Sequence, residues 1–202
     1  LSPLKENSKI KALSTYAKTK LLCEKKIQKN KSLKSIILRF FNVCSALDRP
    51  VLGEFHNPET HLVPTIVYKA IYNKKIYIYG KDFNTFDGTC IRDYIHIMDL
   101  VEGHLFALEN LLNNQHQFLN INLGTGRGVS VLELISTFEK VNNVSVPYVF
   151  AERRSGDKVK CVADNALANK VLNWRTKRSL EVMCRDGWKW QKLNPNGYES
   201  LS

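Results

Sequence analysis

Segments with helical spacing of apolar residues alternate with short apolar runs along this chain. Residues 13–27 carry apolar side chains at helical spacing and predict a helix. The run Ser35-Ile-Ile-Leu-Arg-Phe-Phe-Asn42 is almost continuously apolar, which is typical of a strand buried on both faces of a parallel sheet. Residues 44–60 contain turn-forming Pro and Gly residues and predict a loop. Pro64 then fits the first turn of a helix that reaches about residue 73.

The second half of the chain continues this alternation. Asp99 to Glu102 and Ser130 to Glu133 both have the spacing of a capping box, and they predict helices over residues 99–112 and 130–141. The remaining expected elements are strands over 76–79, 118–123 and 144–151, and short helices over 166–172 and 180–193. Alternating strands and helices predict an α/β protein.

Composition narrows the class of protein. The 202 residues are 44% hydrophobic, enough for a sizeable core in one large domain or in parts of two. No apolar run approaches the ~18 residues of a membrane span, and no apolar leader opens the chain, so we expect neither a membrane segment nor a secretory signal. The five cysteines are widely spaced and form no C-x-x-C pair, which favours a reducing cytoplasm over a disulfide framework.

The net charge of +11 leaves a second class open. Ten lysines fall between Lys5 and Lys34, which is compatible with a basic nucleic-acid-binding domain. The run holds Lys rather than Arg and few aromatic residues, and it coincides with the first predicted helix. A solvated helix face is therefore the favoured interpretation, and we expect no nucleic-acid partner. A steep salt dependence of DNA binding would support the alternative.

Tyr16 and Lys20 are the first candidate catalytic pair. They stand four residues apart, so a helix places them on one face. A phenol beside an ammonium can act as a base, because the positive charge favours the phenolate. A second Tyr-x-x-x-Lys, at Tyr77 and Lys81, straddles a predicted strand end and is interpreted as a chance match.

Charged residues and glycines supply further candidates. Arg92 and the pair Arg153-Arg154 suit a diphosphate, because guanidinium groups bind oxygens bidentately; the alternative is ion pairing with Asp93 or Glu152. The run Gly124-Thr-Gly-Arg-Gly128 has the wrong spacing for a dinucleotide fingerprint and predicts a tight turn instead.

The histidines are expected to be structural rather than metal-binding. Glu54, His56, Glu59 and His61 have the composition of metal ligands, but their spacing matches no zinc signature, so we predict no metal. His96 and His104 are interpreted as packed or hydrogen-bonded residues, and the three tryptophans as packing residues.

Several segments, taken together and in order, carry a family resemblance. They are STYAKTK, LRFFNV, GEFHNPETHLVP, IYGKDFNTFDGTCIRDYIHIMDL, NINLGTGRGVSV, ERRSGD, VADNALANKVLNW and WKWQKLNPNGY. They resemble the UDP-glucose 4-epimerases, which are extended short-chain dehydrogenase/reductases, and they cover nearly the whole chain. The blocks around IRDYIH and ERRSGD are the more specific, because the whole superfamily shares the Tyr/Lys pair.

The resemblance implies a fold and a division into domains. The chain would hold the C-terminal part of a doubly wound, Rossmann-type parallel sheet and a small α/β substrate-binding domain. Residues 1–45 would end the NAD-binding domain. Residues 46–202 would mainly bind the UDP-sugar, with segments near 88–125 returning to the Rossmann sheet. Nothing matches the glycine-rich cofactor loop, so we expect roughly 130 residues upstream and an inactive isolated chain.

The resemblance also implies an activity, the NAD-dependent interconversion of UDP-glucose and UDP-galactose through a 4-keto sugar. Tyr16 would take the proton of the 4-hydroxyl while hydride leaves C4 for NAD and later returns to the other face. A cytoplasmic homodimer, built partly through the Tyr16 helix, is implied as well. Related alternatives are a 4,6-dehydratase and a UDP-glucuronate 4-epimerase.

Site residues follow by position in the matching segments. Tyr16 and Lys20 would be catalytic, and with Phe40 and Phe41 they would contact NAD. In the substrate site, Arg92 and Arg154 would clamp the diphosphate, and Asp157 would bind the ribose. The full substrate-binding set is Asn42, His61, Leu62, Tyr77, Ile78, Tyr79, Arg92, Tyr94, Arg154, Asp157 and Cys161. Cys161 replaces a large aromatic residue of some members, which would leave room for N-acetylated UDP-hexosamines (UDP-GlcNAc and UDP-GalNAc).

Overall fold

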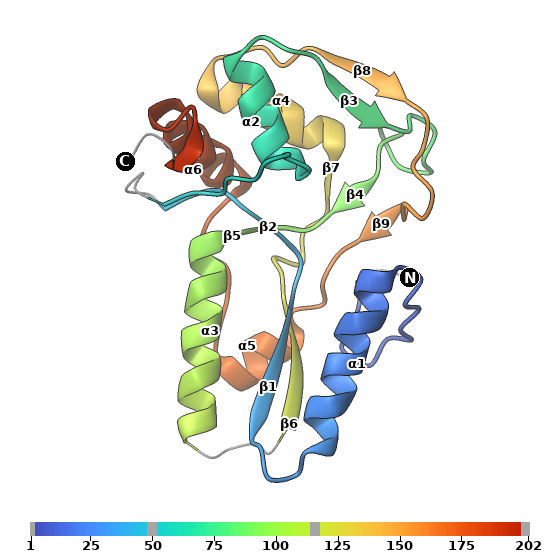
Figure 1. The fold of residues 1–202 in the computed structure, drawn as a ribbon, viewed down its shortest axis with the longest axis vertical. Helices are drawn as coiled ribbons and strands as arrows, with labels where there is room; N and C mark the ends of the chain where they lie inside the picture. Colours follow the sequence, from blue (N-terminus) through green and yellow to red (C-terminus); the bar gives the residue numbers. More distant parts are fainter. Residues whose placement is uncertain (1–2, 48–51, 114–117, 199–202) are drawn as a thin grey trace.

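The computed structural model describes residues 3–47, 52–113 and 118–198, in which helices and strands alternate (Figure 1). In chain order the elements are α1 (Thr15–Lys29), β1 (Ser35–Phe40), β2 (Asn42–Cys44), α2 (Leu62–Ile71), β3 (Ile76–Tyr79), β4 (Ile91–Arg92), β5 (Tyr94–His96), α3 (Ile97–Leu112), β6 (Phe118–Leu123), β7 (Val129–Ser130), α4 (Val131–Asn142), β8 (Tyr148–Ala151), β9 (Lys160–Cys161), α5 (Ala166–Leu172) and α6 (Leu180–Leu193). No helix among the described residues has the length and apolar character needed to cross a bilayer.

Two of the helix starts follow local sequence rules. Ser14 caps α1 by accepting a hydrogen bond from the Ala17 amide at 3.1 Å. Ser130 and Glu133 form the predicted capping box at the start of α4, with each side chain accepting from the other residue's backbone amide.

The start of α3 differs from the prediction. The helix begins at Ile97, two residues before Asp99, and its N-cap is His96, whose Nδ1 accepts from the Met98 amide at 3.0 Å. Asp99 is fully buried and accepts from Arg178 at 2.5 Å instead. The predicted box at Asp99 is therefore wrong, because a tertiary partner engages the carboxylate that the local pattern assigned to capping.

The predicted strand over residues 144–151 is also shorter than expected. The Val144 amide donates to the Glu139 carbonyl, and the Val146 amide donates to the Glu139 carboxylate at 2.8 Å. These backbone groups are thus engaged by the end of α4, and sheet pairing starts only at Tyr148. Strands β2, β4, β5, β7 and β9 are only two or three residues long, too short for an alternating pattern to reveal.

Parallel strand pairs form the centre of the molecule. β1 pairs with β6 over six residues, β2 with β5, and β3 with β8, all in parallel. β4 lies between antiparallel β7 and parallel β9. Parallel pairing needs crossover connections, and here helices supply most of them, so the α/β prediction is confirmed.

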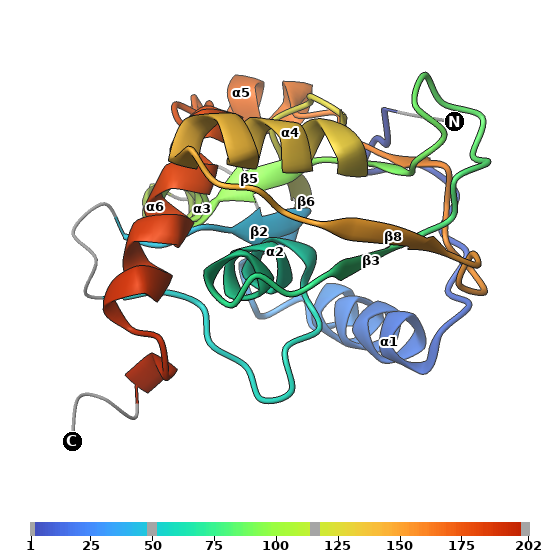
Figure 2. The same ribbon diagram turned by 90° about the horizontal axis from the view of Figure 1, so that it is seen from above.

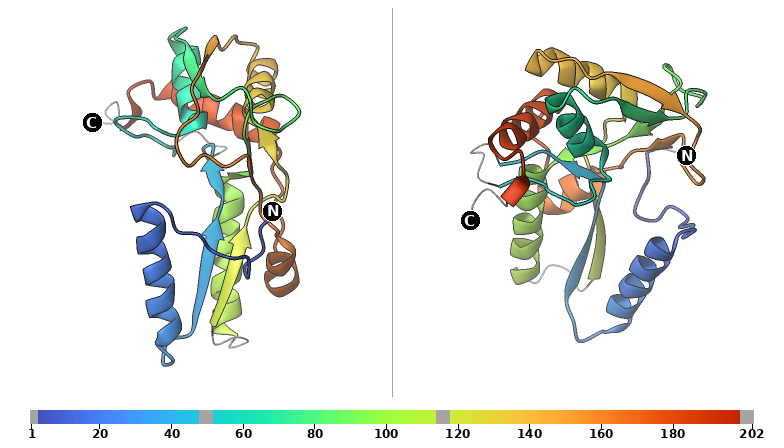
Figure 3. Two further views of the ribbon diagram at one scale, coloured as in Figure 1. Left: turned by 90° about the vertical axis from the view of Figure 1, so that its right-hand side faces the viewer. Right: turned by 45° about the horizontal axis from the view of Figure 1, so that its top comes forward.

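Helices cover both sides of the β1–β6 pair, with α1 on one side and α3 and α5 on the other (Figure 3). The side facing α3 and α5 is packed, and its core holds Ile121, Leu123 and Trp174. On the other side α1 packs less closely, and none of its residues is buried. A bidentate ion pair joins this helix to β1: Arg39 of β1 donates to both carboxylate oxygens of Glu24, at 2.8 and 2.5 Å.

A second apolar cluster joins α2, α4 and α6 to β3, the strand that runs beside β8 (Figure 2). It contains Ile66 of α2, Ile78 of β3 and Phe138 of α4, and the Phe138 and Trp188 rings meet edge to face with centroids 5.6 Å apart. In Figure 1 the helices α2, α4 and α6 lie above the short β2–β5 pair, and β1, β6, α3 and α5 lie below it. Residues of β2 and β5 belong to both clusters. The division into residues 1–45 and 46–202 stays a prediction.

Candidate active site

A cavity of about 900 Å³ opens where β1 and β2 end. Ligands of open α/β sheets bind outside the carboxyl ends of the strands, so this is the expected place for a site. Seven of the residues expected to bind cofactor or substrate line it: Phe40, Phe41, Asn42, His61, Leu62, Tyr94 and Cys161. They come from segments spread over some 120 residues, and the fold brings them to one surface.

Neutral polar groups are built into the cavity wall. Tyr94 is 4% exposed, and burial raises the pKa of its phenol, which therefore stays protonated. Burial also raises the pKa of the Cys161 thiol. Both groups present a polar atom without a charge, and Cys161 does so with a small side chain.

Asp93 holds together the segments beside the cavity. It is fully buried and accepts four hydrogen bonds, from the Thr125 amide (2.9 Å), the Thr125 hydroxyl (2.6 Å), the Gly126 amide (3.0 Å) and the Ala163 amide (3.1 Å). A Cβ at Gly124 would lie 2.7 Å from its carboxylate, so glycine is needed there. The glycine run is a tight turn leading to the Ser130 cap, as predicted. The role of Asp93 was missed, because its partners lie 32 or more residues away.

The basic residues expected to clamp a diphosphate are both paired with the carboxylate expected to bind the ribose. Arg154 Nε donates to Asp157 at 3.0 Å, and Arg92 Nη2 lies 3.6 Å from the same carboxylate. Arg92 also donates to the carbonyls of Ile91 and Lys158. The ion-pair alternative named Asp93 or Glu152 as the partner, and this was wrong, because Asp93 is already saturated by other donors. Arg92, Arg154 and Asp157 lie outside the lining of the cavity.

Strand β3 presents two of its three candidate residues to the exterior. Tyr77 and Tyr79 are exposed, and the Arg154 guanidinium lies 4.8 Å from the Tyr79 ring centroid. The side chain of Ile78 points the other way into the core, because successive residues of a strand face opposite sides. The Ile78 side chain is therefore absent from the surface that carries Tyr77 and Tyr79.

The Tyr16 and Lys20 side chains share a face of α1, as the spacing predicted. The Lys20 ammonium lies 5.5 Å from the Tyr16 ring centroid. Tyr16 is 71% exposed, and neither residue lines the cavity. The Tyr77/Lys81 repeat straddles the end of β3, in agreement with its dismissal.

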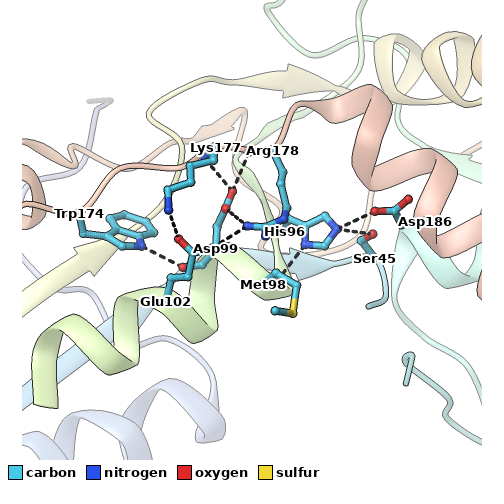
Figure 4. A network of polar contacts seen from close by, with 9 residues as sticks. All are labelled: Ser45, His96, Met98, Asp99, Glu102, Trp174, Lys177, Arg178 and Asp186. Atoms are coloured by element: carbon cyan, nitrogen blue, oxygen red, sulfur yellow. Dashed lines mark hydrogen bonds and ion pairs between the residues drawn. The ribbon is translucent and has the colours of Figure 1, made fainter. Parts of the chain in front are cut away.

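A buried polar network connects the cavity wall to α6 (Figure 4). His96 Nε2 lies 3.0 Å from the Ser45 hydroxyl and 3.4 Å from the Asp186 carboxylate. Because its Nδ1 accepts from Met98, the proton resides on Nε2, and both oxygens face that one nitrogen. The His96 ring thus donates toward Ser45, which lines the cavity, and holds this side chain in place. It does not have the free nitrogen that a base would need to activate the Ser45 hydroxyl. The prediction that His96 is a hydrogen-bonded structural residue is confirmed. No sequence pattern links His96 to Ser45, because the two residues lie 51 positions apart.

His96 predicts a pH dependence of stability. Burial, followed by the charge of Arg178, lowers its pKa below the ordinary value, against the opposing effect of Asp186 and Asp99. Below about pH 6.5 the unfolded chain therefore binds a proton that folded His96 does not, and the free energy of unfolding falls as the pH drops. In urea unfolding, the loss of unfolding free energy between about pH 7.5 and about pH 5.5 should be smaller in His96→Gln than in the parent protein. His104 is exposed, and His104→Gln is the control, which should keep the pH dependence of the parent protein. If His96→Gln also keeps that pH dependence, His96 is not its source.

A group of histidines and glutamates also assembles at the loop before α2. The side-chain ligand atoms of Glu54, His56, Glu59 and His61 all lie within 4.8 Å of one another. The prediction of no metal rested on sequence spacing, which did not reveal this convergence. Glu54 and His61 also line the cavity.

The parallel pairs, the helices that cover them and the cavity at the strand ends define a Rossmann-type α/β protein. Residues 2–124 match the sequence profile of the NAD dependent epimerase/dehydratase family. The chain belongs to this family.

Similar proteins of known function are described as UDP-glucose 4-epimerases. The chain is 42% identical over 205 residues to a UDP-glucose 4-epimerase of Bacillus subtilis, covering 98% of this chain and 60% of that one. A Drosophila melanogaster UDP-glucose 4-epimerase is 43% identical over 192 residues, which is 92% of this chain and 55% of the relative. The chain thus spans about 60% of the length of such relatives.

Solved structures give the same picture. The UDP-glucose 4-epimerase of Stenotrophomonas maltophila, with bound NAD and formylated UDP-arabinopyranose, matches with a TM-score of 0.93 at 37% identity, over 96% of this chain and 60% of that one. That of Bifidobacterium longum, in complex with NAD+ and UDP, matches with a TM-score of 0.89 at 33% identity, over 98% of this chain and 60% of that one. The predicted fold class is confirmed: an α/β chain that matches part of a Rossmann-type epimerase.

Proposed function

We propose that the protein interconverts UDP-glucose and UDP-galactose at C4, with NAD as its bound cofactor. The observation that carries this proposal is the convergence of seven expected ligand-binding residues on one cavity at the carboxyl ends of parallel strands. The UDP-glucose 4-epimerases that resemble this chain support the choice of reaction over a 4,6-dehydratase or a UDP-glucuronate 4-epimerase.

The residues at the end of β1 fit a nicotinamide ring. Phe40 is 53% exposed although it ends an otherwise half-buried strand, so an aromatic face stands open at the sheet edge where dinucleotides bind. Phe40, Phe41, Tyr16 and Lys20 would hold the cofactor. When bound, NAD supplies an acceptor for the hydride of C4 and gives the same hydride back.

Tyr16 would hold and return the proton in this reaction. Its phenolate removes the proton of the 4-hydroxyl as C4 is oxidised, and its phenol restores it as C4 is reduced. The ammonium of Lys20 lies 5.5 Å from the ring centroid, so both side chains would meet the same part of the substrate and cofactor. The exposure of both side chains on α1 leaves them accessible to substrate and cofactor.

The rest of the substrate would be bound by groups of matching chemistry. Asn42, His61, Leu62 and Tyr94 line the cavity and would contact the UDP-sugar. Arg92 and Arg154 would exchange their shared contact with Asp157 for the diphosphate, which leaves that carboxylate free to accept from the ribose hydroxyls. The exposed Tyr77 and Tyr79 would lie beside the uracil, with the backbone of Ile78 between them.

The direct test uses the natural protein that carries this chain, supplied with NAD. Incubation with UDP-galactose should yield UDP-glucose, and the reverse reaction should reach the same equilibrium, with no net reduction of NAD. Formation of a 4-keto-6-deoxy product, or turnover of UDP-glucuronate alone, would assign the protein to one of the related reactions instead.

The proposal also covers assembly and location. The protein would act as a homodimer in the cytoplasm and would have no nucleic-acid partner.

Cys161 predicts the range of substrates. A small, neutral thiol in the cavity wall leaves room for an N-acetyl group, so UDP-GlcNAc and UDP-GalNAc should be interconverted too. Cys161→Tyr should lower kcat/KM for UDP-GalNAc at least about tenfold, which corresponds to ~1.4 kcal/mol, while UDP-galactose is still turned over. Cys161→Ser, which keeps the size, is the matched control. Parent enzyme that epimerises UDP-galactose but not UDP-GalNAc would refute this prediction.

A further inference from the structure

We propose that Glu54, His56, Glu59 and His61 form a site for one divalent transition-metal ion, of which Zn²⁺ is the natural probe, at the mouth of the cavity. The two imidazoles turn the same atom inward: Nδ1 of His61 lies 2.5 Å and Nδ1 of His56 lies 3.5 Å from Oε1 of Glu54. The rings meet edge to face with centroids 4.8 Å apart. Four ligand atoms of the types that zinc prefers thus converge on one small volume.

The distances around His56 are those of a tetrahedral site. Ligand atoms about 2.1 Å from a zinc ion lie about 3.4 Å from one another. Nδ1 of His56 lies 3.4 Å from Oε2 of Glu59 and 3.5 Å from Oε1 of Glu54. Nδ1 of His61 lies 2.5 Å from the same Glu54 oxygen, so this exposed ring would have to move back by about 1 Å to admit an ion.

Backbone contacts hold the ligands in place. Oε1 of Glu59 accepts from the amides of Thr60 and His61, both at 2.7 Å, which directs the other oxygen toward His56. His61 is the N-cap residue of α2. Next to Glu54, the backbone of Gly53 both donates to and accepts from the Tyr198 hydroxyl. Such outer contacts orient metal ligands and strengthen binding.

The composition of the group suits a divalent ion, because two imidazoles and two carboxylates offer one ligand atom each and the two carboxylates balance the charge of the ion. Nitrogen and carboxylate ligands together suit zinc better than magnesium or calcium, which prefer oxygen alone.

The test measures metal binding by the natural protein after treatment with a chelator. Titration with Zn²⁺, followed by calorimetry, should show one ion per chain, and Co²⁺ should give the visible absorption of a tetrahedral site. His56→Ala removes a ligand that does not line the cavity, and it should weaken Zn²⁺ binding at least about tenfold. Glu59→Ala should do the same.

His104→Ala, on α3, is the matched control and should bind Zn²⁺ like the parent protein. Thermal unfolding in chelator establishes that each variant is folded. Absence of Zn²⁺ binding, or equal binding by folded His56→Ala and His104→Ala, would overturn the proposal. Because the readout is metal binding alone, the result is independent of the proposed epimerase activity.

Discussion

Replacing Tyr16 by Phe is expected to reduce the rate of UDP-galactose epimerisation about 10²- to 10⁴-fold, the usual contribution of a positioned acid–base group. The substitution removes one hydroxyl from an exposed position of α1, where no residue is buried, so the fold should not change. The proton of the 4-hydroxyl then has no acceptor on the helix. Affinity for UDP, measured by calorimetry, should remain that of the parent, because the loss concerns kcat and not nucleotide binding.

Tyr72→Phe is the matched control for this experiment. Tyr72 is also exposed, at the end of α2, and it lies outside the cavity lining, so its loss of a hydroxyl should leave kcat unchanged. A Tyr16→Phe variant that retains more than about a tenth of the parent rate would exclude Tyr16 as the base. Lys20 would then have no phenol to activate, and the acid–base group would have to be sought elsewhere.

Replacing Asp93 by Asn is expected to lower the free energy of unfolding by about 3 kcal/mol or more. One carboxylate oxygen accepts from the Thr125 amide and hydroxyl, and the other accepts from the amides of Gly126 and Ala163. An amide side chain keeps only one acceptor oxygen and turns its NH₂ toward two amide donors. Each hydrogen bond to a buried charged group contributes about 1.5–3 kcal/mol, so losing two of them explains the expected size.

Urea unfolding checks this prediction, with Asp82→Asn as the matched control. Asp82 carries the same functional group but pairs with Arg153 at the surface, where its side chain is 70% exposed. Removing such an exposed pair costs at most about 1 kcal/mol. If both variants lose stability equally, Asp93 does not hold the three segments together.

The sequence was a good guide where a rule is local. The Ser130–Glu133 box and the shared face of Tyr16 and Lys20 both depend on residues within about one helical turn. The motifs that resemble epimerases are also contiguous, which is why the amino-acid sequence alone was enough to predict the family. Where a distant partner intervenes, as Arg178 does at Asp99, the same local rule failed.

The amino-acid sequence by itself thus determined the α/β class, the helices and the longer strands, and the identities of seven residues that line the cavity. Only the tertiary structure decided which carboxylate serves which partner. In the folded chain Asp93 accepts hydrogen bonds from the glycine turn, and Asp157 pairs with Arg92 and Arg154. Two histidines and two glutamates also lie together beside the cavity. The physical reason is that hydrogen bonds and ion pairs act over a few ångströms in space, whatever the separation of their members along the chain.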